Sequence, residues 1–393
     1  MMYRRIILLL CLIIGASLFC CSHLQNKNHF PEKTTIQFAS WGSESEIKIL
    51  KPLLNKFEQE NPDIKIDFLH IPQNYFQKIH LLFASNTSPD VIFINNQYLP
   101  VYANAGVLED LSNQDVSFSY DEFYPESLRA LSWSGKLYAI PRDVSTLLIF
   151  YNKDIFDRYN VPYPKKNWTM KDFLITAQKL THRPDVFGIS FEEEPLFYLP
   201  YLTVNGGGFE SGVFEKPESR SSLKFYADLR NKYHAAPLKE ESASATMAQM
   251  FLQEKLGMHL SGRWLVPKYR EEAKFDWDVV EFPAGNNGSV VPLDASGWAI
   301  SKSSRHKKEA LMLIKYLSSE ACSKEFTKSG LIVPARIDTA NSKVFLDGQK
   351  PENAIAFLNI IKNAKPTPVS VDYREILDSV KSKTEYLFNK KQN

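Results

Sequence analysis

Strand-like and helix-like segments alternate along the first hundred residues of the chain. The short apolar segment Ile36–Ala39 and the alternating segment Ile64–Phe68 indicate strands, and the continuous apolar run Val91–Ile94 indicates a strand buried on both faces. Between these strands, apolar residues recur at helical spacing over 47–57 and over 76–83. This alternation predicts a mostly parallel sheet flanked by helices.

The helix over 47–57 carries a start signal and one irregularity. Ser43 or Ser45 precedes it, and either hydroxyl can cap the first turn. Pro52 falls inside the pattern, where its ring and missing N–H disturb a helix. We therefore expect Pro52 to kink this helix or to confine its start.

The second half of the chain also contains strand-like and helix-like segments. Leu147–Tyr151 indicates a strand, and Thr169–Asp172 is a capping-box pattern that opens a helix up to residue 180. Apolar spacing predicts another helix over 223–233 and a long helical region from Lys307 that stops near Gly330. Cys322 lies in that region, where we expect a buried, inert thiol.

The amino terminus has the pattern of an export signal. Arg4 and Arg5 precede the apolar run Ile6–Phe19, whose fourteen residues span about 21 Å as a helix, short of the ~30 Å hydrocarbon core. Leu18 lies three residues before Cys21, which resembles the lipobox of bacterial lipoproteins, although Phe19 and Cys20 depart from its usual small residues. We interpret 1–20 as a lipoprotein signal peptide, Cys21 as the lipidated residue and the polar stretch 21–33 as a tether; the alternative is an ordinary signal peptide with incidental cysteines.

Length and composition fit two globular domains. The chain has 393 residues, 44% of them hydrophobic and 23% charged, which excludes wholesale disorder. The formal charge of +2 gives no argument for nucleic acid as a partner. Three of the four cysteines belong to the leader, so the body holds one thiol and no internal disulfide.

No pattern of catalysis is present in the sequence. It lacks the GxxxxGK phosphate-binding loop and the GxSxG nucleophile elbow, and its histidines lack metal-ligand spacing. Asn205–Gly208 has no following Lys-Ser/Thr and indicates a turn, and Glu192–Glu194 indicates a solvated loop. We therefore expect no enzyme, no metal and no cofactor.

Several segments in a fixed order resemble a known family. The similarity spans roughly 34–386, and it is carried by Ile36–Gly42, Phe57–Ile66, Ser88–Val91, Leu137–Pro141, Tyr151–Phe156, Trp168–Thr169, Gly257–Met258, Ser261–Trp264, Pro283–Gly285, Ser296–Ile300 and Val333–Ala335. Together these segments resemble family 1 extracellular solute-binding proteins, the carbohydrate receptors of ABC importers.

The resemblance implies a particular α/β architecture, the periplasmic-binding-protein type II fold. Two lobes are joined by crossing strands, with a ligand cleft between them. The implied N-terminal lobe comprises 34–141 and 292–332, the hinge crossing 142–146, and the C-terminal lobe 147–291 and 333–393. Such a hinge bends, and a ligand that contacts both lobes shifts the open–closed equilibrium.

Polar and aromatic residues near the implied cleft are the candidate ligand contacts. A sugar needs polar groups around its edge and aromatic faces for stacking. The candidates from the first lobe and the hinge are Trp41, Ser43, Glu44, Asn95, Asn96, Arg142, Asp143, Gly297 and Trp298. Those from the second lobe and the tail are Tyr201, Asn205, Arg263, Trp264, Arg336 and Tyr373.

The resemblance implies a monomeric, lipid-anchored receptor in the bacterial cell envelope, on the periplasmic or extracellular face. It would capture a carbohydrate and deliver it to ABC permease subunits served by a separate ATPase. Arg142, Arg263 and Arg336 leave a glycerol-phosphate or polyol ligand open, because a phosphate needs converging cations. Glu44 and Asp143 leave open a surface carbohydrate-active enzyme, which needs two carboxylates facing across a sugar. A sensory co-receptor or scaffold with the same fold is a further alternative.

Overall fold

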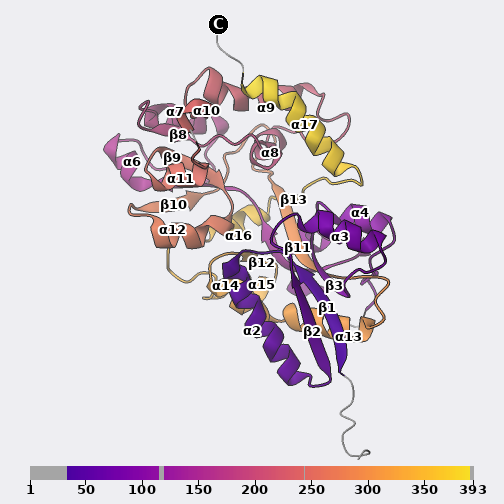
Figure 1. The fold of residues 1–393 in the computed structure, drawn as a ribbon. Coiled ribbons are helices and arrows are strands. Elements are labelled where there is room, and N and C mark those ends of the chain that lie inside the picture. Colours follow the sequence, from indigo (N-terminus) through magenta and orange to yellow (C-terminus); the bar gives the residue numbers. More distant parts are fainter. Residues whose placement is uncertain (1–32, 115–118, 243, 390–393) are drawn as a thin grey trace, which may run out of the picture.

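Two separate β-sheets organise the molecule in this computed structural model, which describes residues 33–114, 119–242 and 244–389 (Figure 1). The predicted signal peptide and Cys21 lie outside these residues. We call the first sheet and its helices the first lobe, and the second sheet and its helices the second lobe. In Figure 1 the first lobe is below and the second, with β8, β9 and β10, above.

The described strands of the first sheet number seven, and a strand from late in the chain lies at the centre. The order is β12-β6-β11-β3-β1-β2, and β13 also pairs with β11. β1 is parallel to β2 and β3, whereas β11 is antiparallel to β3 and β6. The strands are β1 (Thr34–Ser40), β2 (Ile64–His70), β3 (Val91–Asn95), β6 (Ile140–Ser145), β11 (Pro292–Ile300), β12 (Val333–Pro334) and β13 (Lys365–Pro366).

The second sheet has four described strands in the order β10-β7-β9-β8. Only β8 and β9 are parallel within it. The strands are β7 (Leu148–Asn152), β8 (Phe187–Ile189), β9 (Leu256–Ser261) and β10 (Trp277–Val280); a hairpin of β4 (Ser132–Trp133) and β5 (Lys136–Leu137) stands apart. All four strands of the second sheet are buried along their whole length, because helices cover it.

Helices cover both sheets (Figure 1). The first lobe contains α2 (Glu44–Glu60), α3 (Tyr75–Ala84), α4 (Leu99–Asn104), η1 (Tyr120–Glu122), α5 (Pro125–Ala130), α13 (Lys307–Leu317), α14 (Glu320–Lys328) and α15 (Ile337–Ala340). The second contains α6 (Lys153–Arg158), α7 (Met170–Leu180), α8 (Pro195–Thr203), α9 (Pro217–Asn231), α10 (Lys239–Ser242), α11 (Met247–Leu252), η2 (Arg263–Leu265), α12 (Val266–Glu272), α16 (Ala356–Ile361) and α17 (Tyr373–Phe388).

Two of the expected helix starts are confirmed, and the expectation of one long helical region after residue 307 is wrong. Ser43 caps α2, and Thr169 and Asp172 form both hydrogen bonds of the capping box of α7. Pro52 does not confine the start of α2, which begins eight residues earlier, and the other alternative, a kink at Pro52, stays a prediction. The helical region after residue 307 is two helices, because Ser319 adopts an extended backbone and caps a new helix.

The chain passes between the lobes several times. β6 of the first sheet leads directly into β7 of the second, and β10 of the second sheet leads into β11 of the first. β12, just past residue 332, pairs with β6 and so belongs to the first sheet. After α15 the chain returns to the second lobe, where α16 and α17 lie.

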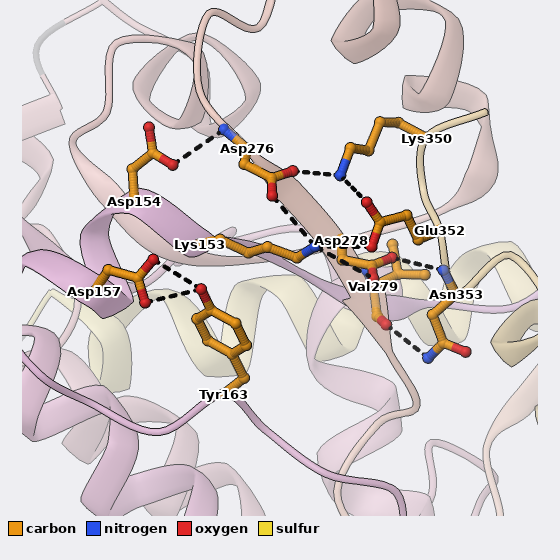
Figure 2. Close-up of polar contacts among 10 residues, drawn as sticks. All are labelled: Lys153, Asp154, Asp157, Tyr163, Asp276, Asp278, Val279, Lys350, Glu352 and Asn353. Atoms are coloured by element: carbon orange, nitrogen blue, oxygen red, sulfur yellow. Dashed lines mark hydrogen bonds and ion pairs between the residues drawn. The ribbon is translucent and has the colours of Figure 1, made fainter. Parts of the chain in front are cut away.

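A polar network holds this returning segment on the second lobe (Figure 2). Lys350 pairs with Asp276 and Glu352, and Lys153 Nζ lies 3.1 Å from Glu352 Oε2. Asn353 donates its backbone N–H to Asp278 at 2.9 Å and its side-chain amide to the Val279 carbonyl at 3.0 Å. These bonds cover β10, an edge strand whose free groups would otherwise invite another chain.

The described helices are all too short or too polar to cross a membrane. Cys322 is buried in α14, and burial raises the pKa of its thiol, as expected for an unreactive cysteine.

Candidate functional site: a cavity between the lobes

A cavity of about 230 Å³ lies where the two lobes meet. Trp41 reaches it from the end of β1, Asp143 from β6, and Ser296 from β11. Arg263 and Trp264 line it from the second lobe, directly after β9. The other lining residues are Glu46, Arg142, Val144, Ser145, Thr146, Leu331, Ile332 and Val333. Five predicted site residues therefore meet in one cavity: Trp41, Arg142, Asp143, Arg263 and Trp264.

A buried cluster of one guanidinium and two carboxylates forms the first-lobe wall. Arg142 Nε donates to Asp143 Oδ2 at 2.5 Å, and Arg142 Nη1 donates to Glu46 Oε1 at 2.6 Å. The guanidinium also lies 4.1 Å from the centre of the Phe93 ring. Burial raises the pKa of Asp143 although Arg142 opposes the rise. Burial lowers the pKa of Arg142, but the charges of Asp143 and Glu46 outweigh it and the net shift is upward.

Glu46 belongs to this wall, although it is not among the site residues predicted from the sequence. Ser43 and Glu46 have the spacing of a capping box, so an acid at this position is explained by helix capping alone. The structure shows the Ser43 half of that box, with Glu46 N–H donating to Ser43 Oγ, while the Glu46 carboxylate instead binds Arg142. An acid at the first turn of a helix that follows a cleft strand is the signal that could have found it.

Arg263 belongs to the second-lobe wall, and its guanidinium is buried behind that wall. It is 3% exposed, and none of its three guanidinium nitrogens has a hydrogen-bond partner among the described residues. Its guanidinium lies 4.0 Å from the centre of the Phe345 ring and 5.2 Å from that of Phe357. Burial lowers the pKa of Arg263 to about 9, with a smaller contribution from the nearby Arg270, so it stays charged at neutral pH.

Trp264 presents an open aromatic face beside Arg263. It is 38% exposed although it lines the cavity. Its ring lies against the backbone of Gly262, where an added Cβ would come within 1.9 Å of Trp264 Cζ3. Gly262 therefore leaves the room that this ring occupies, and a side chain at position 262 would displace it. Trp41, on the opposite lobe, is half-buried, and its ring centre lies 4.2 Å from that of Phe93.

Trp298 and Tyr201 are core residues in this structure, where we expected cleft residues. Trp298 is fully buried against Phe38 and Phe93. β11 runs antiparallel to β3, with Ser296 opposite Asn95 and Trp298 opposite Phe93. Trp298, two residues after Ser296, therefore lies away from the cavity, in the middle of the sheet. Tyr201 is 1% exposed and packs among the aromatic side chains of the second lobe.

The predicted asparagines, Gly297 and the start of α2 have local structural roles. Asn95 accepts a hydrogen bond from the Tyr98 N–H, and Asn96 binds Asp294 and the Ala295 N–H.

Asn205, in the second lobe, binds the Tyr201 carbonyl oxygen, Ser222 and the Asn286 N–H, beside a separate cavity. At Gly297 an added Cβ would lie 2.2 Å from the Ile140 carbonyl oxygen. Ser43 caps α2 and Glu44 is exposed in its first turn.

Arg336 and Tyr373 also lie outside the lining of the cavity. Arg336 is buried and committed to Glu122 and Asp338 in the first lobe. Tyr373 is buried at the start of α17, and burial raises its pKa. No group of His, Cys, Asp or Glu in the described parts of the chain could hold a metal ion.

Comparisons with known proteins agree on one family. The family model described as bacterial extracellular solute-binding protein matches residues 41–321. The galactooligosaccharide-binding protein of Bacillus subtilis is 22% identical over 390 residues, covering 94% of this chain and 89% of that protein. The maltodextrin-binding protein of the same organism is 25% identical over 361 residues, covering 85% and 80%.

Two solved structures are similar to this chain over most of its length. An ABC substrate-binding protein of Listeria monocytogenes, in complex with cycloalternan, has a TM-score of 0.82 and 27% identity, covering 91% of this chain and 94% of that one. The sugar-binding protein MalE of Xanthomonas citri has a TM-score of 0.78 at 23% identity, covering 92% and 93%, which shows a shared fold.

Proposed function

Because this chain belongs to the bacterial extracellular solute-binding protein family, we propose that it captures a carbohydrate in the cavity between its lobes and delivers it to the permease of an ABC importer. The predictions of the family and of an α/β fold of the periplasmic-binding-protein type II class are confirmed. The relatives named for galactooligosaccharide, maltodextrin and cycloalternan support a carbohydrate as the ligand class.

The observation that carries this proposal is the pairing of two complementary walls. Carboxylates of Asp143 and Glu46 line the first-lobe side, where they can accept hydrogen bonds from sugar hydroxyls. The half-exposed ring of Trp264 lines the second-lobe side, where it can stack on the C–H face of a sugar ring. A ligand held by both walls binds the closed form better than the open one, and so shifts the molecule towards closure.

Two alternatives fit the cavity less well. A phosphate needs converging cations, but Arg142 is committed to two carboxylates and Arg336 lies outside the lining. A glycosidase needs carboxylates on opposite sides of a sugar, whereas Glu46 and Asp143 bind the same guanidinium and Glu44 is not in the lining. We therefore infer a binding protein that catalyses nothing.

Anchoring and partners follow as further parts of the proposal. The family is one of extracellular proteins, so the chain is exported. We propose that Cys21 carries a lipid that holds the monomer on the outer side of a membrane, with permease and ATPase supplied by other chains. If Cys21→Ser still labels with a fatty-acid probe and stays with membranes, this anchoring is wrong. A sensory or scaffolding role would be indicated by ligand binding without a cognate permease.

A thermal-shift screen of the purified protein with sugars, polyols and glycerol phosphates tests the function. A ligand that binds only the folded state raises the melting temperature as its concentration increases. We expect sugars to produce this rise and glycerol phosphates not to. A folded protein that responds to glycerol phosphates alone, or to no compound of the panel, would contradict the proposal.

A further inference from the structure

We propose that Arg142 is a positioning residue, whose guanidinium holds the carboxylates of Glu46 and Asp143 so that one oxygen of each stays free to accept a hydrogen bond from a sugar hydroxyl. This inference rests on the proposed function, because it concerns the groups that would bind the sugar. It starts from the way in which the hydrogen bonds of the first-lobe wall are divided.

Arg142 occupies one oxygen of each carboxylate and leaves the other unused. Its Nε donates to Asp143 Oδ2 at 2.5 Å, and its Nη1 donates to Glu46 Oε1 at 2.6 Å. Within the described part of the chain, no group donates to Asp143 Oδ1 or to Glu46 Oε2, and neither oxygen is among the buried polar atoms without a partner. Both oxygens therefore keep some accessible surface. Because both side chains line the cavity, we infer that a sugar reaches these two acceptors.

Gly42 leaves the acceptor of Glu46 uncovered. It lies between Trp41 and the start of α2, and an added Cβ at this position would come within 2.9 Å of Glu46 Oε2. A side chain at position 42 would therefore crowd the oxygen that Arg142 leaves unused.

Arg142 itself rests on aromatic rings of the first core. Its guanidinium carbon lies 4.1 Å from the ring centre of Phe93, 5.2 Å from that of Phe326 and 5.7 Å from that of Trp298. All three rings are buried, so they give the planar guanidinium a fixed support. A fixed guanidinium orients both carboxylates before a sugar arrives, which lowers the ordering cost of binding.

Arg142 also favours the ionised form of both carboxylates. Burial raises the pKa of Asp143, the charge of Arg142 opposes this rise, and the charge of Glu46 adds to it. Without Arg142, two neighbouring buried acids would have no cation between them. One proton would then be shared by the pair and would occupy an oxygen that could otherwise accept a hydroxyl.

The other charged and titratable groups around the pair do not replace Arg142. Arg263 lines the cavity from the second lobe, but its guanidinium is buried behind that wall. His70, at the end of β2, has its Nε2 3.0 Å from the Gly42 carbonyl oxygen. Glu44 is exposed in the first turn of α2 and carries a negative charge. Arg142 is thus the one cation among the described residues that forms an ion pair with either carboxylate.

The test measures sugar affinity against pH by calorimetry on folded wild type and Arg142→Met. The probes are maltotriose, galactobiose and D-glucose, and the probe that wild type binds most tightly is used throughout. We expect Arg142→Met to lose about 10- to 100-fold in affinity at neutral pH. Between about pH 8 and 5.5 it should lose up to about tenfold more per pH unit as the pH falls, whereas wild type should change less than about threefold.

Two further variants separate charge, geometry and general stability. Arg142→Lys keeps a positive charge but lacks the planar fork, so it should restore the flat pH profile and only part of the affinity. Arg336→Met is the matched control, because Arg336 is also a buried arginine that binds two acids, Glu122 and Asp338, but lies outside the lining. The folded Arg336→Met protein should keep the affinity and the pH profile of wild type.

A ligand-free measurement covers the case in which Arg142→Met binds too weakly to titrate. The shared proton stays on the folded protein at a pH at which the unfolded chain has lost it. The free energy of unfolding of Arg142→Met should therefore fall more steeply than that of wild type as the pH rises from about 5.5 to 8. Urea unfolding at several pH values measures this slope, and a slope equal to that of wild type would overturn the inference.

The outcomes also distinguish this inference from the function on which it rests. An equal loss of sugar affinity at every pH in Arg142→Met would indicate a direct contact or a structural role, and it would overturn the positioning role while leaving sugar capture intact. Wild-type affinity in Arg142→Met would do the same. If folded wild type binds no sugar of an extended panel, the proposed function fails together with the inference.

Discussion

Arg142 and Asp143 are consecutive residues of one strand, yet their side chains bind each other, with Nε and Oδ2 2.5 Å apart. Successive side chains of a regular strand point to opposite faces. Here Asp143 is paired with Ser296 and Pro141 with Gly297, so Arg142 is an extra residue without a partner on β11. Such a bulge re-aims side chains, and it brings the guanidinium and the carboxylate to the same wall of the cavity.

Asp143→Ala should weaken ligand binding strongly. The change removes an acceptor for sugar hydroxyls in a closed site and leaves Arg142 with Glu46 alone. We expect a loss on the order of 2–4 kcal/mol, about 30- to 1000-fold in affinity, and a smaller loss for Asp143→Asn. Calorimetry on folded variants measures it, with Glu44→Ala, exposed in α2, as the control. Unchanged affinity in Asp143→Ala would remove this residue from the site.

Trp264→Ala should mainly lower ligand affinity, whereas Trp298→Ala should mainly lower stability. Trp264→Ala should lower ligand affinity by about 0.5–1.5 kcal/mol beyond lost contact area, with little effect on folding. Trp298→Ala opens a hole in the first core and should cost about 3–5 kcal/mol of stability while sparing affinity in the folded fraction. Calorimetry and denaturant unfolding measure the two quantities. A large loss of affinity in a stably folded Trp298→Ala protein would indicate that Trp298 contacts the ligand.

Gly262→Ala should reproduce the binding defect of Trp264→Ala while keeping the ring. The new Cβ would overlap the indole at 1.9 Å, so the ring must leave its place. We expect an altered emission spectrum, because this half-exposed tryptophan changes its surroundings, together with weaker binding. Gly288→Ala, at a glycine with open space around the added Cβ, is the comparison. Wild-type affinity in Gly262→Ala would contradict the role of the ring.

Arg263→Met should stabilise the ligand-free protein. Wild type carries the free-energy cost of a buried, unpartnered cation, and replacement of buried charges by apolar residues of similar volume is often stabilising by about 1–4 kcal/mol. Urea unfolding without ligand measures the gain. Arg336→Met, which breaks a paired arginine, should instead destabilise. A destabilised Arg263→Met protein would indicate a partner for this guanidinium.

His259 should make the second lobe sensitive to acid. It is buried beside Tyr269, with Nδ1 and Oη 2.6 Å apart, and burial lowers its pKa to about 3. Between that pH and the unfolded value of about 6.5, the unfolded chain binds a proton that the folded one refuses, so stability rises with pH. We expect this residue to contribute at most about 1.4 kcal/mol per pH unit in that window. His259→Gln should flatten the slope, and an unchanged slope would assign acid sensitivity to other groups.

The sequence predicted elements better than it predicted which side chains reach the cavity. Hydrophobic spacing located β3, α7 and the burial of the sheets, because periodicity reports directly on burial. Trp264 and Trp298 look alike in sequence, since each lies one or two residues after a glycine at the end of a similar motif. Only the register of β11 against β3 places Trp298 in the core. That register depends on pairing between residues about two hundred positions apart, which the local sequence does not reveal. Glu46 was hidden because one acid can cap a helix or bind an arginine.

The central place of β11 has a consequence for the order in which the molecule can be made. β3 and β6 have no hydrogen bonds to each other in the first sheet and are joined through β11, which the chain supplies only at Pro292–Ile300. A growing chain that has produced the first 291 residues still has three strand edges in its first sheet without their native partners: one edge of β3, and both edges of β6, which pairs with β11 and β12. Its amino-terminal half therefore lacks the central strand of its sheet until most of the chain has been made, which suits a polypeptide that is exported.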